Sequence, residues 1–150
     1  MTARKLLGGR LTRQMVTYLE ACTHCGLCSE ACHFYLSTGD SHMSPVYKAD
    51  QLRRLYLRHY RRWGRIFPKR TGPIQLGHKD LQELKEAFFG SCTLCRRCNL
   101  NCPFGVDTAL LARASRSMLN SLGLTPGGLK EAVEIHLQTG NNMAVSEEEL

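Results

Sequence analysis

Apolar residues recur every three or four positions along much of this chain, which is the period of helices that bury one face. No segment alternates apolar and polar residues with enrichment in β-branched types, as a half-buried strand would. The predicted helices cover residues 12–22, 46–63, 80–88, 107–123 and 125–140. The pattern therefore predicts an all-α fold with few or no strands.

Residues typical of helix ends support the predicted helix boundaries. Thr12 and Asp107 are placed to cap a helix start, and the spacing of Asp80 and Glu83 fits a capping box. Glycines end four of the segments, at Gly64, Gly90, Gly123 and Gly140. Clusters of Gly, Pro, Ser and Asp predict loops around residues 39–45 and 68–77.

At 150 residues the chain suits a single domain. We expect a helical core over residues 12–140, a short basic N-terminal arm over 1–11 and a tail over 141–150. The chain contains no run of about 18 apolar residues, so no membrane span is predicted. Residues 1–20 contain no apolar stretch typical of a secretory signal, which favours a cytoplasmic location.

The net charge of +7 is distributed unevenly. Residues 48–70 contain nine Lys and Arg residues against one acidic residue, while the remaining chain has a net charge of −1. These basic residues are expected on the polar face of the predicted helix 46–63. Three explanations stay open for the basic segment 48–65: a solvated face, a docking site for an acidic protein partner, and contact with anionic lipid or nucleic acid.

Eight cysteines fall into two runs that share one spacing, C-x2-C-x2-C-x3-C, with none left over. The runs comprise Cys22, Cys25, Cys28 and Cys32, and then Cys92, Cys95, Cys98 and Cys102. Pro103 follows the second run, and His33 stands at the matching position of the first. This spacing is the bacterial signature of a [4Fe–4S] cluster, so the chain is predicted to bind two such clusters.

The fourth cysteine of such a run ligates the other cluster in two-cluster proteins. Cluster 1 is therefore assigned to Cys22, Cys25, Cys28 and Cys102. Cluster 2 is assigned to Cys92, Cys95, Cys98 and Cys32. This crossed pattern would join segments far apart in the sequence, so the clusters would act as part of the core.

Disulfides and structural zinc are the competing explanations for the cysteines. A disulfide framework needs an oxidising compartment, for which the sequence gives no sign. Structural zinc favours paired C-x2-C ligands that close a tetrahedron, and triplets with a separate fourth cysteine fit that poorly. Iron–sulfur ligation is therefore the favoured interpretation.

The two runs, separated by a helical basic insert, resemble the helical-ferredoxin family over residues 12–140. The stretch from Cys22 to Tyr35 is most similar to the heterodisulfide reductase branch. This branch comprises the iron–sulfur subunit of heterodisulfide reductase, the N-terminal module of its two-domain relative and DsrK-like proteins. The tail from Leu137 to Met143 is similar too. The resemblance implies an all-α protein that relays electrons through two [4Fe–4S] clusters and is not a catalyst alone.

The resemblance also implies a partner subunit, one that carries a CCG-type catalytic cluster domain and the thiol–disulfide chemistry. Contact with a membrane is expected only through such a partner, and nucleic acid is not expected as a ligand. Two alternatives stay open. The chain could be the N-terminal cluster module of a longer catalytic oxidoreductase, or an iron–sulfur redox sensor that binds nucleic acid through residues 48–65.

Residues beside the cysteines carry further expectations. His24 and His33 are expected to be partly exposed loop residues, with tuning of a cluster as the alternative. Gly26 is expected to allow a tight bend of the chain around a cluster. An apolar sheath around the clusters is predicted from Leu27, Leu94, Leu100, Phe104 and Val106.

Overall fold

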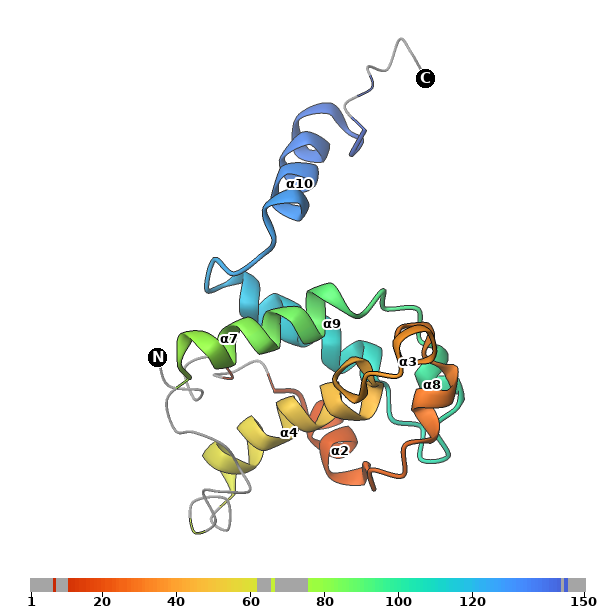
Figure 1. The fold of residues 1–150 in the computed structure, drawn as a ribbon. Helices are drawn as coiled ribbons and strands as arrows, with labels where there is room; N and C mark the ends of the chain where they lie inside the picture. Colours follow the sequence, from red (N-terminus) through yellow and green to blue (C-terminus); the bar gives the residue numbers. More distant parts are fainter. Residues whose placement is uncertain (1–6, 8–10, 62–65, 67–75, 144, 146–150) are drawn as a thin grey trace.

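The computed structural model describes residues 7, 11–61, 66, 76–143 and 145 of the chain. These residues form helices joined by turns, and none of them lies in a strand (Figure 1), which confirms the all-α prediction. The elements in chain order are α2 (Arg13–Ala21), η1 (Leu27–Ala31), α3 (His33–Thr38), η2 (Ser41–Met43), α4 (Pro45–Tyr60), α7 (His78–Lys85), η3 (Glu86–Gly90), α8 (Arg97–Leu100), α9 (Thr108–Asn120) and α10 (Gly127–Thr139). None of the described helices is long and apolar enough to cross a lipid bilayer.

Helix α2 begins where the sequence predicts and leads directly into the first cysteine run. Thr12 is the N-cap, and its Oγ1 accepts a hydrogen bond from the backbone N–H of Met15 at 3.2 Å. Met15 and Leu19 are buried in the core. The helix ends at Ala21, so Cys22 is the first residue beyond it.

Helix α4 starts at Pro45, whose fixed φ suits a first helical position. The Oγ of Ser44 caps it by accepting a hydrogen bond from the N–H of Tyr47 at 3.2 Å. Leu52, Leu55 and Tyr56 are buried, as the apolar pattern predicts. The helix continues to Tyr60, and the predicted last turn with Trp63 and Gly64 lies outside the described residues.

The expectation that the basic residues of this segment share one polar face is wrong for the described part of α4. Lys48 and Arg58 are only 2% and 8% exposed. Arg61 binds the carboxylate of Glu20 on α2, and Arg53 lies 3.2 Å from Nδ1 of His24. Arg54 is 42% exposed and lies 3.9 Å from Asp50. Sequence periodicity cannot show such burial or such partners. The other four basic residues, Arg62, Arg65, Lys69 and Arg70, lie outside the described residues.

Helix α7 starts two residues before the predicted cap. Gly77 is the N-cap, and the carboxylate of Asp80, in the first turn, accepts a hydrogen bond from the Gly77 N–H at 2.7 Å. The predicted capping box of Asp80 with Glu83 is therefore wrong, because Asp80 is not the N-cap and its carboxylate instead accepts from the N–H of the N-cap residue Gly77. The helix then widens into the π-helical turn η3, closed by a hydrogen bond from the Ser91 N–H to the Glu86 carbonyl at 3.0 Å. This turn ends at Gly90, and Ser91 connects it to Cys92, the first cysteine of the second run.

Asp107 caps α9 as predicted, with its Oδ1 accepting from the Leu110 N–H at 2.9 Å. Leu111, Met118 and Leu119 of α9 are buried, and Leu110 and Ala114 are partly buried. Helix α4 packs against both α2 and α9 (Figure 1), and the main core lies between them. Its largest buried side chains are Leu7, Met15, Leu19, Leu52, Phe88, Leu111, Met118 and Leu119.

Helix α10 follows Pro126 and ends at Gly140, which has a φ of 79°, as the sequence predicts. Figure 1 shows this helix leading away from the rest of the fold. Its apolar residues Leu129, Val133 and Leu137 are accordingly exposed. The two cysteine runs lie at the opposite end of the fold from α10.

Candidate functional site

Two hollows are each lined by four cysteines. One is lined by Cys22, Cys25, Cys28 and Cys102, and the other by Cys32, Cys92, Cys95 and Cys98. Each hollow thus combines three cysteines of one run with the last cysteine of the other, which is the grouping that the crossed pattern predicts. None of the eight cysteines forms a disulfide, and Thr108 lines both hollows.

The two cysteine loops have the same backbone conformation, 70 residues apart. His24 and Leu94, before the second cysteine of each run, have φ values of 58° and 60°. Gly26 and Arg96, after that cysteine, have φ values of 83° and 64°. The bend expected at Gly26 is confirmed. The other three positions carry side chains in a region that costs energy, as is common at functional sites.

The third and fourth cysteines of each run are placed by a short helical turn. Cys28 lies in η1 and Cys98 in α8. The N–H of Cys32 donates to Ser29 at 3.0 Å, and that of Cys102 donates to Asn99 at 3.2 Å. After Cys32 the chain continues directly into α3, which begins at His33.

Hydrogen bonds from distant residues fix the loops. The guanidinium of Arg116 on α9 donates to the carbonyls of Phe88, at 2.7 Å, and of Cys92. The side-chain amide of Asn101 donates to the Leu27 carbonyl at 2.9 Å and so joins the two runs. No local pattern in the sequence indicates these contacts, since both partners are set by tertiary packing.

Two cysteines have thiols whose ionisation is disfavoured. Burial raises the pKa of Cys28 to about 11, and the neighbouring cysteines, Cys98 first among them, add to the effect. Burial also raises the pKa of Cys98, against a hydrogen bond with Thr108 that lowers it. The N–H of Val106 lies 3.4 Å from the Sγ of Cys102. Negative charge on these sulfurs therefore needs a cation or metal nearby.

The residues present fit iron–sulfur clusters. Four soft thiolates per site suit iron–sulfur or zinc chemistry. Among the described residues no three Cys, His, Asp or Glu side chains converge on a point where a single metal ion would bind.

His24 and His33 differ in their surroundings. His24 is partly exposed, and its Nε2 lies 3.2 Å from Oδ1 of Asp50 on α4. Together with Arg53, this contact ties the first cysteine loop to α4. His33 is exposed at the start of α3 and packs against Phe34, with ring centroids 4.6 Å apart. Both are partly or fully exposed, as expected, but His33 is the first residue of a helix and not part of a loop. Their effect on a cluster stays a prediction.

The apolar sheath predicted around the clusters is wrong for three of its five members. Leu27, Leu100 and Phe104 are 42%, 87% and 53% exposed, and only Val106 is buried. Cys25 and Cys95 are exposed as well. Both hollows therefore reach the surface, and apolar side chains stand beside them.

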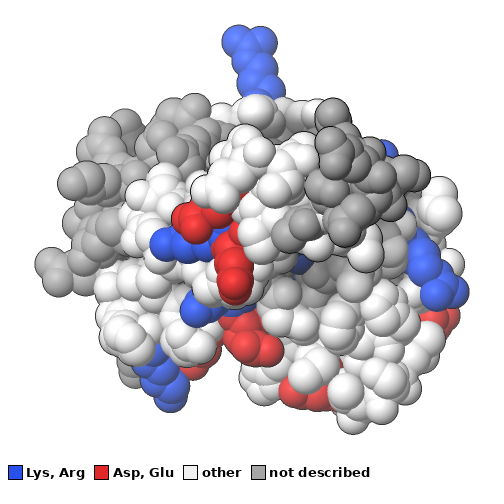
Figure 2. Space-filling view, turned by 90° about the horizontal axis from the view of Figure 1, so that it is seen from above, with Lys and Arg blue, Asp and Glu red and all other residues white. Residues whose placement is uncertain are grey.

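Surface charges near the second run are paired in part. The guanidinium of Arg96 lies 2.7 Å from the carboxylate of Asp107, which is almost fully buried. On the face seen from above, Figure 2 shows acidic and basic side chains interspersed among the described residues.

Comparison with known proteins gives the family. Residues 18–106 match the model of the 4Fe-4S dicluster domain. The chain is 35% identical to the Hdr-like menaquinol oxidoreductase iron-sulfur subunit 2 of Archaeoglobus fulgidus, over 89% of this chain and 24% of that protein. It is 34% identical to the corresponding iron-sulfur subunit of Archaeoglobus profundus, again over 89% and 24%. It is 30% identical to a subunit of the dihydromethanophenazine:CoB–CoM heterodisulfide reductase of Methanosarcina mazei, over 79% and 28%.

These relatives confirm the resemblance to heterodisulfide reductase proteins. The chain spans about a quarter of the length of the curated relatives it matches. No solved structure matches the chain.

Proposed function

The chain belongs to the 4Fe-4S dicluster domain family and its cofactors are two [4Fe–4S] clusters, and from this premise we propose that it relays electrons between them and a partner subunit. The observation that carries the proposal is the crossed grouping of four cysteines around each of two hollows. A bound cluster of this kind accepts and gives up one electron at a time.

The proposed ligands are the cysteines of the two hollows. Cys22, Cys25, Cys28 and Cys102 would hold cluster 1, and Cys32, Cys92, Cys95 and Cys98 would hold cluster 2. Thr108 lines both hollows, so the two sites are neighbours. This proximity supports transfer from one site to the other.

Substitution of single cysteines tests the crossed assignment. Cys25→Ser and Cys102→Ser should alter the EPR signal of the same cluster, although the two residues come from different runs. Cys95→Ser and Cys32→Ser should alter the signal of the other cluster. If Cys32→Ser instead alters the signal that Cys25→Ser alters, each run binds its own cluster and the assignment is wrong.

The proposed partner belongs to a heterodisulfide-reductase-like complex and carries a CCG-type catalytic domain. The proposal is supported by the relatives, which are named as an iron-sulfur subunit of a menaquinol oxidoreductase and as part of a heterodisulfide reductase. Docking through the basic segment 48–65 can involve only its exposed part, because Lys48 and Arg58 are buried. The exposed Leu100 and Phe104, beside the cysteines, are the stronger candidates for contact with a redox partner.

The first test is purification without oxygen, followed by measurement of iron and sulfide per chain and EPR of the reduced protein. We expect about eight of each, with the interacting signals of two reduced clusters. One or two metal ions per chain, without sulfide and without an EPR signal, would contradict the proposal and indicate zinc.

The length of the relatives supports a second candidate, in which this sequence is the cluster module of a longer catalytic chain. The intact mass of the native gene product distinguishes it from a separate subunit. A redox sensor that binds nucleic acid would instead show binding that weakens steeply with salt. The engaged cations of α4 give that alternative little support.

A further inference from the structure

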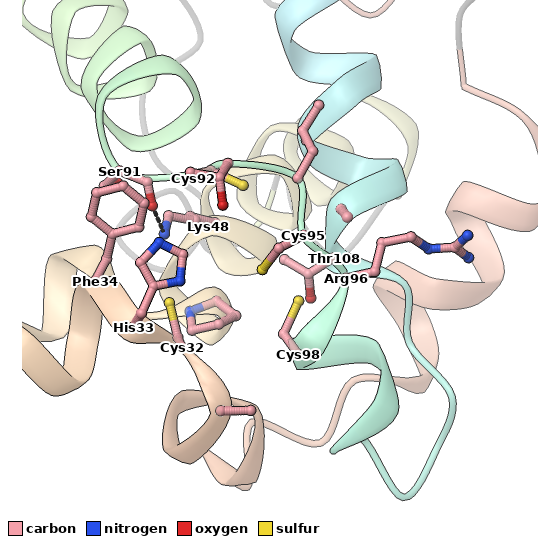
Figure 3. A pocket seen from close by; sticks show the side chains of 15 residues that line it. Cys32, His33, Phe34, Lys48, Ser91, Cys92, Cys95, Arg96, Cys98 and Thr108 are labelled. Atoms are coloured by element: carbon pink, nitrogen blue, oxygen red, sulfur yellow. Dashed lines mark hydrogen bonds between the residues drawn. The ribbon is translucent and has the colours of Figure 1, made fainter.

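Lys48 is a buried cation on the wall of the hollow that Cys32, Cys92, Cys95 and Cys98 line. It lies in the first turns of α4, and its side chain is only 2% exposed. Figure 3 shows it reaching toward Ser91, between the segment of Cys32 and the segment of Cys92. A lysine this deeply buried needs a specific reason, because an ammonium loses its hydration there.

The ammonium of Lys48 joins the two chain segments that supply the cysteines. Its Nζ donates to the carbonyl of Met43 at 2.6 Å and to the carbonyl of Ser91 at 2.5 Å. The same Met43 carbonyl is 3.9 Å from the Sγ of Cys32, and Ser91 directly precedes Cys92. The ring of Phe34 lies 5.7 Å from Nζ. The charge is therefore held in one place beside the hollow.

No carboxylate balances this charge in the described part of the chain, where none of the ion pairs includes Lys48. The other basic side chains in the lining of this hollow are His33 and Arg96, and Arg96 is 62% exposed and pairs with Asp107. Figure 3 shows the Arg96 side chain directed away from the cysteines. The negative charge nearest to Lys48 is thus that of the cysteine sulfurs and of whatever they bind.

The second hollow has a different electrostatic environment. Its described lining includes His24 and otherwise cysteines and uncharged residues, with no lysine or arginine. Net charge and hydrogen bonding around a cluster set its reduction potential. Two sites with equal ligand sets but unequal surroundings are therefore expected to have unequal potentials.

We propose that Lys48 is a positioning and charge-balancing residue that raises the reduction potential of cluster 2 above that of cluster 1. A fixed positive charge stabilises the more negative, reduced state, and its burial protects the effect from screening by salt. At equilibrium the first electron then resides on the cluster that Cys32 helps to bind. This inference rests on the proposed function, since it requires both clusters.

The test is an EPR-monitored redox titration of the intact chain with Lys48→Met, which is neutral and similar in length. Cys25→Ser and Cys95→Ser assign each signal to its cluster. Lys130→Met, which removes an exposed lysine from α10, is the matched control. We expect the reduced-to-oxidised ratio of cluster 2 at a fixed potential to fall about tenfold, or 59 mV for one electron. Cluster 1 and the control should not change.

An unchanged potential of cluster 2 in Lys48→Met, with full iron content, would overturn the inference while leaving the proposed function intact. If Lys48→Met loses iron, Lys48→Gln replaces it, because an amide still donates to the two carbonyls without charge. A lowered potential in Lys48→Gln supports the inference. An unchanged potential, or loss of iron here too, shows that Lys48 serves only to hold the loops together. Absence of clusters from the unmodified protein would instead contradict the proposed function itself.

Discussion

Asp107 has two roles that substitution can separate. Its Oδ1 caps α9 by accepting from the Leu110 N–H at 2.9 Å, and its Oδ2 pairs with Arg96 at 2.7 Å. The carboxylate is almost fully buried, while Arg96 is mostly exposed. The pair fixes Arg96, which adopts a φ of 64° between the second and third cysteines of the second run.

The expected costs follow from these contacts. Loss of a helix N-cap costs about 1 kcal/mol. The ion pair contributes less, roughly 0.2–1 kcal/mol, because solvent screens the exposed Arg96. Asp107→Ala loses both contacts and should destabilise the protein by about 1–2 kcal/mol. Asp107→Asn keeps a good capping residue and should lose only the part due to the ion pair.

The assay is anaerobic urea unfolding, followed by far-UV circular dichroism and by the visible absorption of the clusters. With a slope of about 1–3 kcal/mol per molar urea, Asp107→Ala should lower the midpoint by roughly 1 M. Thr12→Ala is the matched control, since Thr12 also caps a helix through one hydrogen bond, to Met15, and makes no ion pair. It should cost less than Asp107→Ala and about as much as the cap alone.

A second substitution checks the ion pair itself. In an Arg96→Gln background, Asp107→Asn should have no further effect, because the interaction is already absent. If Asp107→Asn destabilises the protein as much as Asp107→Ala, the cap contributes nothing. The assignment of two separable roles would then be refuted.

Three further predictions concern the cysteine loops. Gly26→Ala should cost about 1–2 kcal/mol from its φ of 83° alone, because a Cβ there meets no atom within 4 Å. Gly26→Ala should also release iron, because this loop carries three cysteines. Gly123→Ala is the control: its Cβ would be equally open, at a φ of 72°, but it lies away from the cysteines, so it should destabilise the protein similarly without releasing iron. Equal iron loss from both variants would contradict a specific role of the Gly26 loop in holding a cluster. Burial raises the pKa of Cys28 from 9.0 to about 11, so a proton binds its sulfur about a hundredfold more tightly than that of an ordinary cysteine. Lowering the pH should therefore speed the loss of iron to a chelator, because protons compete with iron for the sulfur. A rate of iron loss that does not change between pH 6 and 8 would exclude this competition. Complete removal of iron should abolish the cooperative unfolding transition measured by circular dichroism, because the clusters join segments that are distant in the sequence. A native-like transition of the metal-free chain would show that the apolar core alone is enough to fold it.

The helical elements and their ends could be predicted from the sequence where the determinants are local. A cap acts over three residues, so Thr12 and Asp107 were recognisable from spacing, and the positive φ at Gly26 follows from its place in the cysteine run. The start of α7 was misplaced because Asp80 can act from either of two positions in a first turn. The shared spacing of the two runs aligns Arg96 with Gly26, although nothing in the sequence indicates that an arginine there adopts a positive φ.

Only the tertiary structure decided which charges are buried and which apolar residues are exposed. From the sequence, Lys48 is expected on a basic face of the helix. In the structure it is buried and donates to the carbonyl of Ser91, 43 positions away. Leu100 and Phe104 were expected in an apolar sheath, yet they are 87% and 53% exposed. The sequence determined the cysteine spacing and hence the chemistry, because ligands within one run are fixed by local geometry. The surroundings of each cluster depend on contacts between distant segments, whose partners no local pattern specifies.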